Sequence, residues 1–297
     1  MSPQDAPTRR SESGKGLLVM GLGLFLFSAV DTGAKFLTSE LHPLQIVWTR
    51  QLGLLVGAVF LLLRYGLPIL QTKHPKLQLL RGSMAVLSAS LFIFALAYVP
   101  LADAVAISFV APFIVTLLGA LILREPVGIR RWVAVTLGFL GVLIVIRPGL
   151  GVVHPAAGLV ILAALFFAIR QIISRALSDT DRTSTTVIYT ALVSTVLLTV
   201  PLPFVWQTPT TEQAFILVLI AVLAAAAEIC VIKALELTLA VVVAPMHYTL
   251  ILWGTFYGWL VFGQLPDVWT WVGTALIVAT GIYSLRREYL ESKLSKA

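Results

Sequence analysis

Residues 109–149 read FVAPFIVTLLGALILREPVGIRRWVAVTLGFLGVLIVIRPG, which are two apolar runs joined by a short segment rich in arginine. An α-helix rises about 1.5 Å per residue, so about 20 predominantly apolar residues cross the hydrocarbon core of a bilayer. The stretch therefore predicts two membrane-spanning helices with a basic loop between them.

The rest of the chain repeats this alternation of apolar runs and short polar breaks. Of its 297 residues, 59% are hydrophobic and only 12% are charged, a composition too apolar for a soluble domain of this size to bury. We predict an all-α polytopic membrane protein with ten transmembrane helices. The expected spans are 16–38, 44–64, 80–99, 102–123, 132–147, 157–178, 185–205, 213–235, 238–262 and 268–285.

The second half of the sequence resembles the first at an offset of about 140 residues. This offset divides the predicted helices into two five-helix repeats, 16–147 and 157–285, flanked by tails at 1–15 and 286–297. Because five crossings are an odd number, the second repeat is expected to be inverted in the membrane. The matched pairs are Lys35 with Arg175, Leu37 with Leu177, Val47 with Val187, Pro126 with Pro266 and Gly141 with Gly281.

The basic residues give the chain an orientation. With a cytoplasmic N-terminus, 17 of the 21 lysines and arginines fall in cytoplasmic segments and only Arg147 falls outside. This bias follows the positive-inside rule, and it explains the net charge of +7 without a nucleic-acid partner. We predict a membrane protein with both tails in the cytoplasm. Inverted repeats are a recurring architecture of secondary transporters, whose substrate site lies near the midplane.

The first helix contains FSAVDTGAKFL, in which Asp31 and Lys35 lie one turn apart. An ionised side chain at the bilayer centre costs at least about 2.5–3.5 kcal/mol, so it needs a partner or a wet cavity. Lys35 is one candidate partner of Asp31, and Arg50, about two turns into the second helix, is another. The group either pins two helices together, or binds a polar part of the substrate, or contains an acid whose protonation is coupled to transport.

Two further charges lie inside predicted helices of the second repeat, Arg170 in the sixth helix and Glu228 in the eighth. They form either a buried structural bridge or a gating and coupling pair. The tripeptide VAP ends at Pro112 in the fourth helix and at Pro245 in the ninth. Each proline removes a backbone donor, so we predict a kink in both helices.

Aromatic side chains supply candidate stacking surfaces for a flat ligand. Tyr248 and Trp253 of the ninth helix are the main candidates, and Trp48 and Tyr98 are secondary ones. Interfacial belts and lipid contact are the alternative explanation for such rings. His247 is the only histidine expected well inside a helix, where it serves either as hydrogen-bonded structure or as a switch.

The chain lacks the common motifs of catalysis and metal binding. It has no phosphate-binding P-loop, no HExxH, no nucleophile elbow and a single cysteine, Cys230. We therefore expect no enzymatic activity, no cofactor and no metal site. The partners expected are the lipid bilayer and a small-molecule substrate, with the chain a monomer or a homodimer.

The two halves end in FVAPFIVTLLGALILREPVGIRRWVAVTLGFLGVLIVIRPG and YTLILWGTFYGWLVFGQLPDVWTWVGTALIVATGIY, which resemble the EamA family of the drug/metabolite transporter superfamily. The early segments FSAVDTGAKFL and HPLQIVWTR resemble the bacterial branch that includes riboflavin and S-adenosylmethionine transporters. The resemblance implies alternating-access transport of a small organic metabolite, and riboflavin uptake is the first candidate function. S-adenosylmethionine, another nucleotide-like metabolite or amino-acid export are the alternatives. Gln264 departs from the acid often found there in the family.

Overall fold

A computed structural model describes residues 6–122, 128–147, 154–177, 180–237 and 244–294. These residues form helices joined by short connections, with no β-strand among them. The elements are α1 (Ala6–Leu37), α2 (Pro43–Tyr65), η2 (Leu67–Leu70), α3 (Pro75–Leu96), α4 (Leu101–Ser108), α5 (Ala111–Ile122), α6 (Ile129–Ile146), α7 (Ala157–Leu177), α8 (Thr183–Thr199), α9 (Leu202–Val205), α10 (Thr211–Leu237), η3 (Ala244–Tyr248), α12 (Thr249–Phe262) and α13 (Val268–Leu294).

Several of these helices are long and apolar enough to cross a bilayer, which confirms an all-helical, multi-pass membrane protein. The six candidate spans in the described residues are Gly14–Leu37, Pro43–Tyr65, Pro75–Leu96, Leu101–Ile122, Ala157–Leu177 and Thr211–Ala234. Shorter apolar helices cover Trp132–Ile146, Ser184–Thr199 and Val268–Tyr283. These lengths do not by themselves fix the predicted number of ten crossings.

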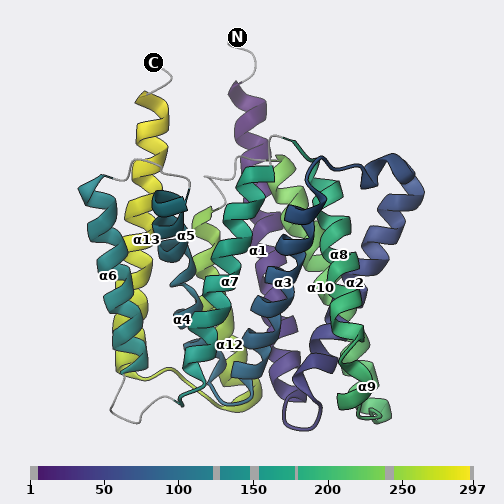
Figure 1. The fold of residues 1–297 in the computed structure, drawn as a ribbon. Coiled ribbons are helices and arrows are strands. Elements are labelled where there is room, and N and C mark those ends of the chain that lie inside the picture. The colour runs from purple at the N-terminus through teal and green to yellow at the C-terminus, as the bar shows by residue number, and fades with distance from the viewer. Residues whose placement is uncertain (1–5, 123–127, 148–153, 178–179, 238–243, 295–297) are drawn as a thin grey trace.

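The first helices of the two halves, α1 and α7, run in opposite directions (Figure 1). Near the end of α1, Lys35 bonds to the backbone carbonyls of Leu96 and Val99. Tyr98, beside these carbonyls, stacks on His154 just before α7 begins. Hence the start of α7 and the end of α1 lie at the same end of the bundle. The first turns of α1 and the last turns of α13 project from the other end, which we call the terminal end (Figure 1).

The packing of helices follows a two-fold pattern between the halves. Helix α1 packs on α10 and α3 packs on α7, so the first helix of each half meets the third of the other. Helices α2 and α8, and α6 and α13, pack on each other as equivalent pairs. Exchanging the halves reproduces each of these contacts between them, as expected for two copies of one unit.

Small residues allow the closest helix crossings. A Cβ added to Gly273 of α13 would lie 2.5 Å from the carbonyl oxygen of Gly141 in α6. A Cβ on Gly53 of α2 would lie 2.1 Å from the carbonyl oxygen of Ala221 in α10. Backbones approach this closely only where no side chain intervenes, which is the usual way helices associate in lipid.

Two helices that the sequence pattern treats as continuous are interrupted. The expected span 102–123 is divided into α4 and α5 by Phe109 and Val110, and Pro112 is the second residue of α5. Proline at this position cannot donate a hydrogen bond to the carbonyl four residues earlier, at Ser108, where α4 ends. Pro245 lies in the short 3-10 helix η3. The segment 238–243, which precedes η3, is outside the described residues.

Candidate substrate site

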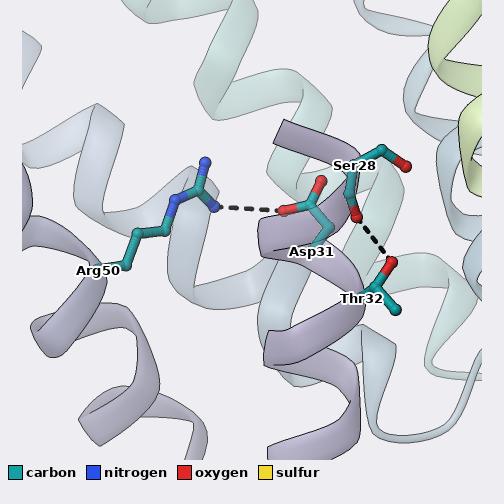
Figure 2. Close-up of polar contacts among 4 residues, drawn as sticks. All are labelled: Ser28, Asp31, Thr32 and Arg50. Carbon is teal, nitrogen blue, oxygen red and sulfur yellow. Dashed lines mark hydrogen bonds and ion pairs between the residues drawn. The ribbon is translucent and has the colours of Figure 1, made fainter. Parts of the chain in front are cut away.

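Asp31 of α1 and Arg50 of α2 form an ion pair inside the helical bundle (Figure 2). Arg50 Nη1 lies 3.4 Å from Asp31 Oδ1, and the side chains retain 20% and 17% of their accessible surface, respectively. The ring of Phe27 lies beneath the guanidinium, 5.8 Å from Arg50 Cζ. Of the two partners expected for Asp31, the structure brings Arg50 to it.

Lys35 bonds to a different group. Its ammonium donates to the carbonyl oxygens of Leu96 and Val99, each at 2.7 Å, and lies 5.5 Å from the ring centre of Phe262. The last carbonyls of a helix have no partner within it, so the end of α3 offers acceptors that hold Lys35 in place. Lys35 therefore caps α3 near one end of the bundle, while Asp31 faces Arg50.

A serine and a threonine lie beside the ion pair on α1 (Figure 2). The hydroxyl of Thr32 donates to the backbone carbonyl of Ser28 at 2.7 Å. Ser28 Oγ is buried and has no hydrogen-bond partner among the described residues. A buried hydroxyl in this condition is available to a bound molecule.

Arg170 of α7 belongs to the same electrostatic group although it comes from the second half. It interacts electrostatically with Glu228 of α10 and with Arg50. Its guanidinium lies 4.7 Å from the ring centre of Phe167, and its Nε is buried without a hydrogen-bond partner in the described part of the chain. The structure thus places Arg170 and Glu228, predicted in the second half, within electrostatic range of each other and Arg170 within range of Arg50, predicted in the first.

Arg81 of α3 joins this group, and the sequence pattern missed it. It donates to the hydroxyls of Ser174 and Thr190 and interacts electrostatically with Arg170 and Glu228. The expected third span began at residue 80, which placed Arg81 at a helix end. Because α3 begins at Pro75, Arg81 lies more than one turn inside the helix.

We call these five residues the central charged cluster. Its members come from five helices, three in the first half and two in the second. Three carry a positive charge and two a negative charge, so the cluster has one excess positive charge. The members are Asp31, Arg50, Arg81, Arg170 and Glu228.

The predicted stacking residues of the ninth helix have different surroundings. Trp253 meets Phe25 of α1 edge-on with ring centres 5.1 Å apart, and its indole Nε1 is buried with no partner among the described residues. Tyr248 stacks on Phe109 at 5.0 Å, and its hydroxyl lies against Gly281. Tyr248 is therefore partly buried against protein, while Trp253 presents an unpaired donor.

Three other candidates lie outside the cluster. Trp48 donates from Nε1 to Thr199 Oγ1 at 2.9 Å, which ties α2 to α8. Tyr98 is 59% exposed. His247 was expected well inside a helix, and this prediction was wrong because the residue is exposed in η3. The broken ninth helix moves it out of the interior.

A second polar group lies at the end of the bundle opposite the terminal end. Arg147, at the end of α6, pairs with Asp267 before α13. The hydroxyl of Thr270 donates to Asp103 of α4 at 3.1 Å. Arg147 was predicted only as an orientation signal, and the other three residues were not predicted as site residues. Their separation along the chain hides their proximity.

This fold and its buried charges define a polytopic membrane transporter. The model of the EamA-like transporter family matches residues 14–147 and again 154–285, so the chain belongs to that family and contains its domain twice. A solved structure superposes over 94% of this chain and 99% of its own with a TM-score of 0.62 at 15% identity, which supports the fold.

Relatives named for the molecules that they transport are also similar to this chain. A riboflavin transporter of Vibrio cholerae is 34% identical, over 75% of this chain and 76% of its own. An S-adenosylmethionine uptake transporter of Rickettsia bellii is 25% identical, over 91% and 94%. A pseudopaline exporter of Pseudomonas aeruginosa is 30% identical, over 90% and 94%. The relatives agree on transport of a small molecule and differ in substrate and direction.

Proposed function

We propose that the protein takes up riboflavin across the bacterial inner membrane through a site at the central charged cluster. The observation that carries this proposal is the cluster itself, because five ionisable side chains inside a lipid-embedded bundle are expensive unless they meet one another, water or a polar ligand. The similarity to the riboflavin transporter of Vibrio cholerae supports this substrate.

The origin of the cluster in both halves suggests how transport works. Asp31, Arg50 and Arg81 belong to the first half, while Arg170 and Glu228 belong to the second. A rocking motion of one half against the other changes the distances between these side chains and exposes them to alternate sides of the membrane. Alternating access around a fixed midplane site is the usual mechanism of carriers with inverted repeats.

We further propose that protonation of Asp31 is coupled to substrate movement and that both chain ends are cytoplasmic. The common position of the start of α1 and the end of α13 supports a shared side for the two ends (Figure 1). The excess of basic residues in the segments of that side supports the cytoplasm. A reporter that fluoresces only in the cytoplasm, fused after Ala297, tests this orientation.

Growth of a riboflavin auxotroph at low riboflavin tests the substrate. We expect growth and uptake of labelled riboflavin only when the gene is present. Asp31→Asn should lose uptake or its dependence on external pH while still reaching the membrane. Glu212→Gln, which removes an exposed acid at the start of α10, is the matched control and should behave like the wild type.

The same cells separate the alternatives. Equal growth with and without the gene rules out riboflavin uptake. Uptake of labelled S-adenosylmethionine then identifies an S-adenosylmethionine carrier, like the Rickettsia relative. If cells lose a preloaded label faster with the gene than without it, the protein is an exporter, like the Pseudomonas relative.

A further inference from the structure

Two buried polar groups around the central charged cluster are donors without acceptors. Arg170 Nε and Trp253 Nε1 have no hydrogen-bond partner among the described residues. A guanidinium and an indole N–H donate hydrogen bonds and cannot accept them. Buried donors are normally paired, because an unpaired one costs stability. At a substrate site, such donors are groups that a bound molecule satisfies.

A series of contacts along α1 and one electrostatic interaction connects these donors. Trp253 packs edge-on against Phe25, which lies about two turns before Asp31 on α1. Asp31 pairs with Arg50, and Arg50 acts electrostatically on Arg170. One elongated molecule lying along α1 therefore has an indole donor towards one end and a guanidinium donor towards the other.

The charge balance points to the same kind of ligand. Asp31 is in contact with Arg50, whereas Glu228 acts on both Arg81 and Arg170. One positive charge therefore has no negative counterpart within the cluster. In a medium of low dielectric constant, an uncompensated guanidinium attracts acceptor oxygens and anions and repels cations.

The rings set the shape of the ligand. Phe25 lies 5.1 Å from Trp253 and 5.4 Å from Tyr257, between ring centres, and Phe167 lies under Arg170. Flat molecules pack favourably against aromatic faces and edges.

We propose that the central charged cluster selects flat molecules that are neutral or anionic and carry acceptor oxygens, with those oxygens bound by Arg170 and Trp253. This inference rests on the proposed carrier function and on the cluster as its site. It excludes flat cations as good substrates, and it names Arg170 and Trp253 as the residues that determine specificity.

Equilibrium dialysis of the purified full chain in detergent tests the proposal with three probes. Riboflavin is flat, neutral and rich in carbonyl oxygens; orotate is a small flat carboxylate; proflavine is a flat cation without a carbonyl group. We expect riboflavin, orotate or both to bind at least about tenfold more tightly than proflavine. Proflavine binding as tightly as the better of the others overturns the proposal, as does binding of none of the three.

Variants connect the preference to the two donors. Trp253→Phe keeps a ring and removes the N–H, and Arg170→Gln removes the excess charge. Each variant should lower the affinity for the preferred probe at least about fivefold without lowering the affinity for proflavine. Trp271→Phe and Arg182→Gln, both at exposed positions, are the matched controls and should leave all affinities unchanged. Equal losses for all probes, or none, contradict the assignment.

Two checks keep the test decisive. If Arg170→Gln gives no monodisperse protein, Arg170→Lys replaces it, because lysine keeps the charge but lacks the planar donor set. If orotate binds in an Arg170-dependent way and riboflavin does not bind, the riboflavin proposal fails while the inferred selectivity stands. If riboflavin binds and the two variants bind it normally, the roles inferred for Arg170 and Trp253 fail while the riboflavin proposal stands.

Discussion

The two ends of the bundle are fastened by equivalent contacts made from different residues. At the terminal end, the hydroxyl of Thr185 at the start of α8 donates to the carbonyl of Ile69, in the segment after α2. At the opposite end, Gln45 at the start of α2 exchanges two hydrogen bonds with the backbone of Gln207, after α9. Each half thus uses the start of its second helix to hold the loop of the other.

The opposite end adds charged contacts to this shared scheme. Arg147 pairs with Asp267, and Asp103 accepts from Thr270, so α4, α6 and α13 are joined there. The Asp267 side chain is 45% exposed, which leaves water able to compete for the pair. We predict that the matched hydrogen bonds persist and that the charged contacts open when the two halves rock against each other.

Gly273→Leu should have the largest effect, because it wedges apart α6 and α13 just inside the charged contacts. The added side chain meets the backbone of Gly141, which cannot rotate away. We expect at least about a tenfold loss of folded protein, measured by size-exclusion chromatography of solubilised membranes. Gly57→Leu is the control, since a Cβ there meets nothing within 4 Å. Normal yield of Gly273→Leu would show that this crossing is not tight.

Removing the matched hydrogen bonds should have the second largest effect. Gln45→Leu removes both bonds to Gln207, and Thr185→Val removes the bond to Ile69. A buried group left unpaired costs about 1–3 kcal/mol, so both variants should melt earlier, Gln45→Leu more so. Thermal unfolding in detergent measures this. A lower melting temperature in only one variant would contradict a frame shared by both ends.

Asp267→Asn should affect conformation more than stability. A partly exposed ion pair contributes about 0.2–1 kcal/mol, so its loss should shift the balance of states up to about fivefold. Ser28→Cys, made in a Cys230→Ala background, gives the chain a single cysteine. The rate at which this cysteine reacts with a thiol reagent, added on the side of the membrane at the opposite end of the bundle, reports this shift. Glu212→Gln is the control at the same end. An unchanged rate for Asp267→Asn would remove this ion pair from the gate.

A change of pH should have the smallest effect on this contact. Burial raises the pKa of Asp267, but hydrogen bonds from Thr270 and Arg147 outweigh it and hold the pKa below the ordinary value of 3.8. A depressed pKa means that the contact is present above 3.8 and is lost only as the pH falls through the lower value. The ratio of the Asp267→Asn rate to the wild-type rate at position 28 should therefore be the same at pH 5 and pH 7, because any effect of Asp31 protonation is common to both proteins. A ratio that differs would point to another titrating group at this contact.

Sequence patterns located the long helices well and located contacts between them poorly. The expected span 213–235 became α10, which extends two residues further at each end, because an uninterrupted apolar run leaves a helix as the only structure that satisfies its backbone in lipid. The expected pairing of Asp31 with Lys35 rested on spacing along one helix. The carbonyls at the end of α3, which the spacing does not reveal, hold Lys35 instead.

Charges at helix ends were the hardest to interpret. Arg81 and Asp103 each fell at the first or second position of an expected span, where a solvated side chain is the ordinary explanation. Only the packing of α3 on α7 and of α4 against α13 brings them to Arg170 and Thr270.

The amino-acid sequence by itself determined the helical membrane class, the duplicated family domain and the presence of buried charges, because hydrophobic length and the cost of ionised groups in lipid are local properties. The tertiary structure decided which charges meet. It joined Asp31 to Arg50, brought Arg170 and Glu228 to the same cluster and removed His247 from the interior, since contacts between distant segments depend on how two inverted halves pack together.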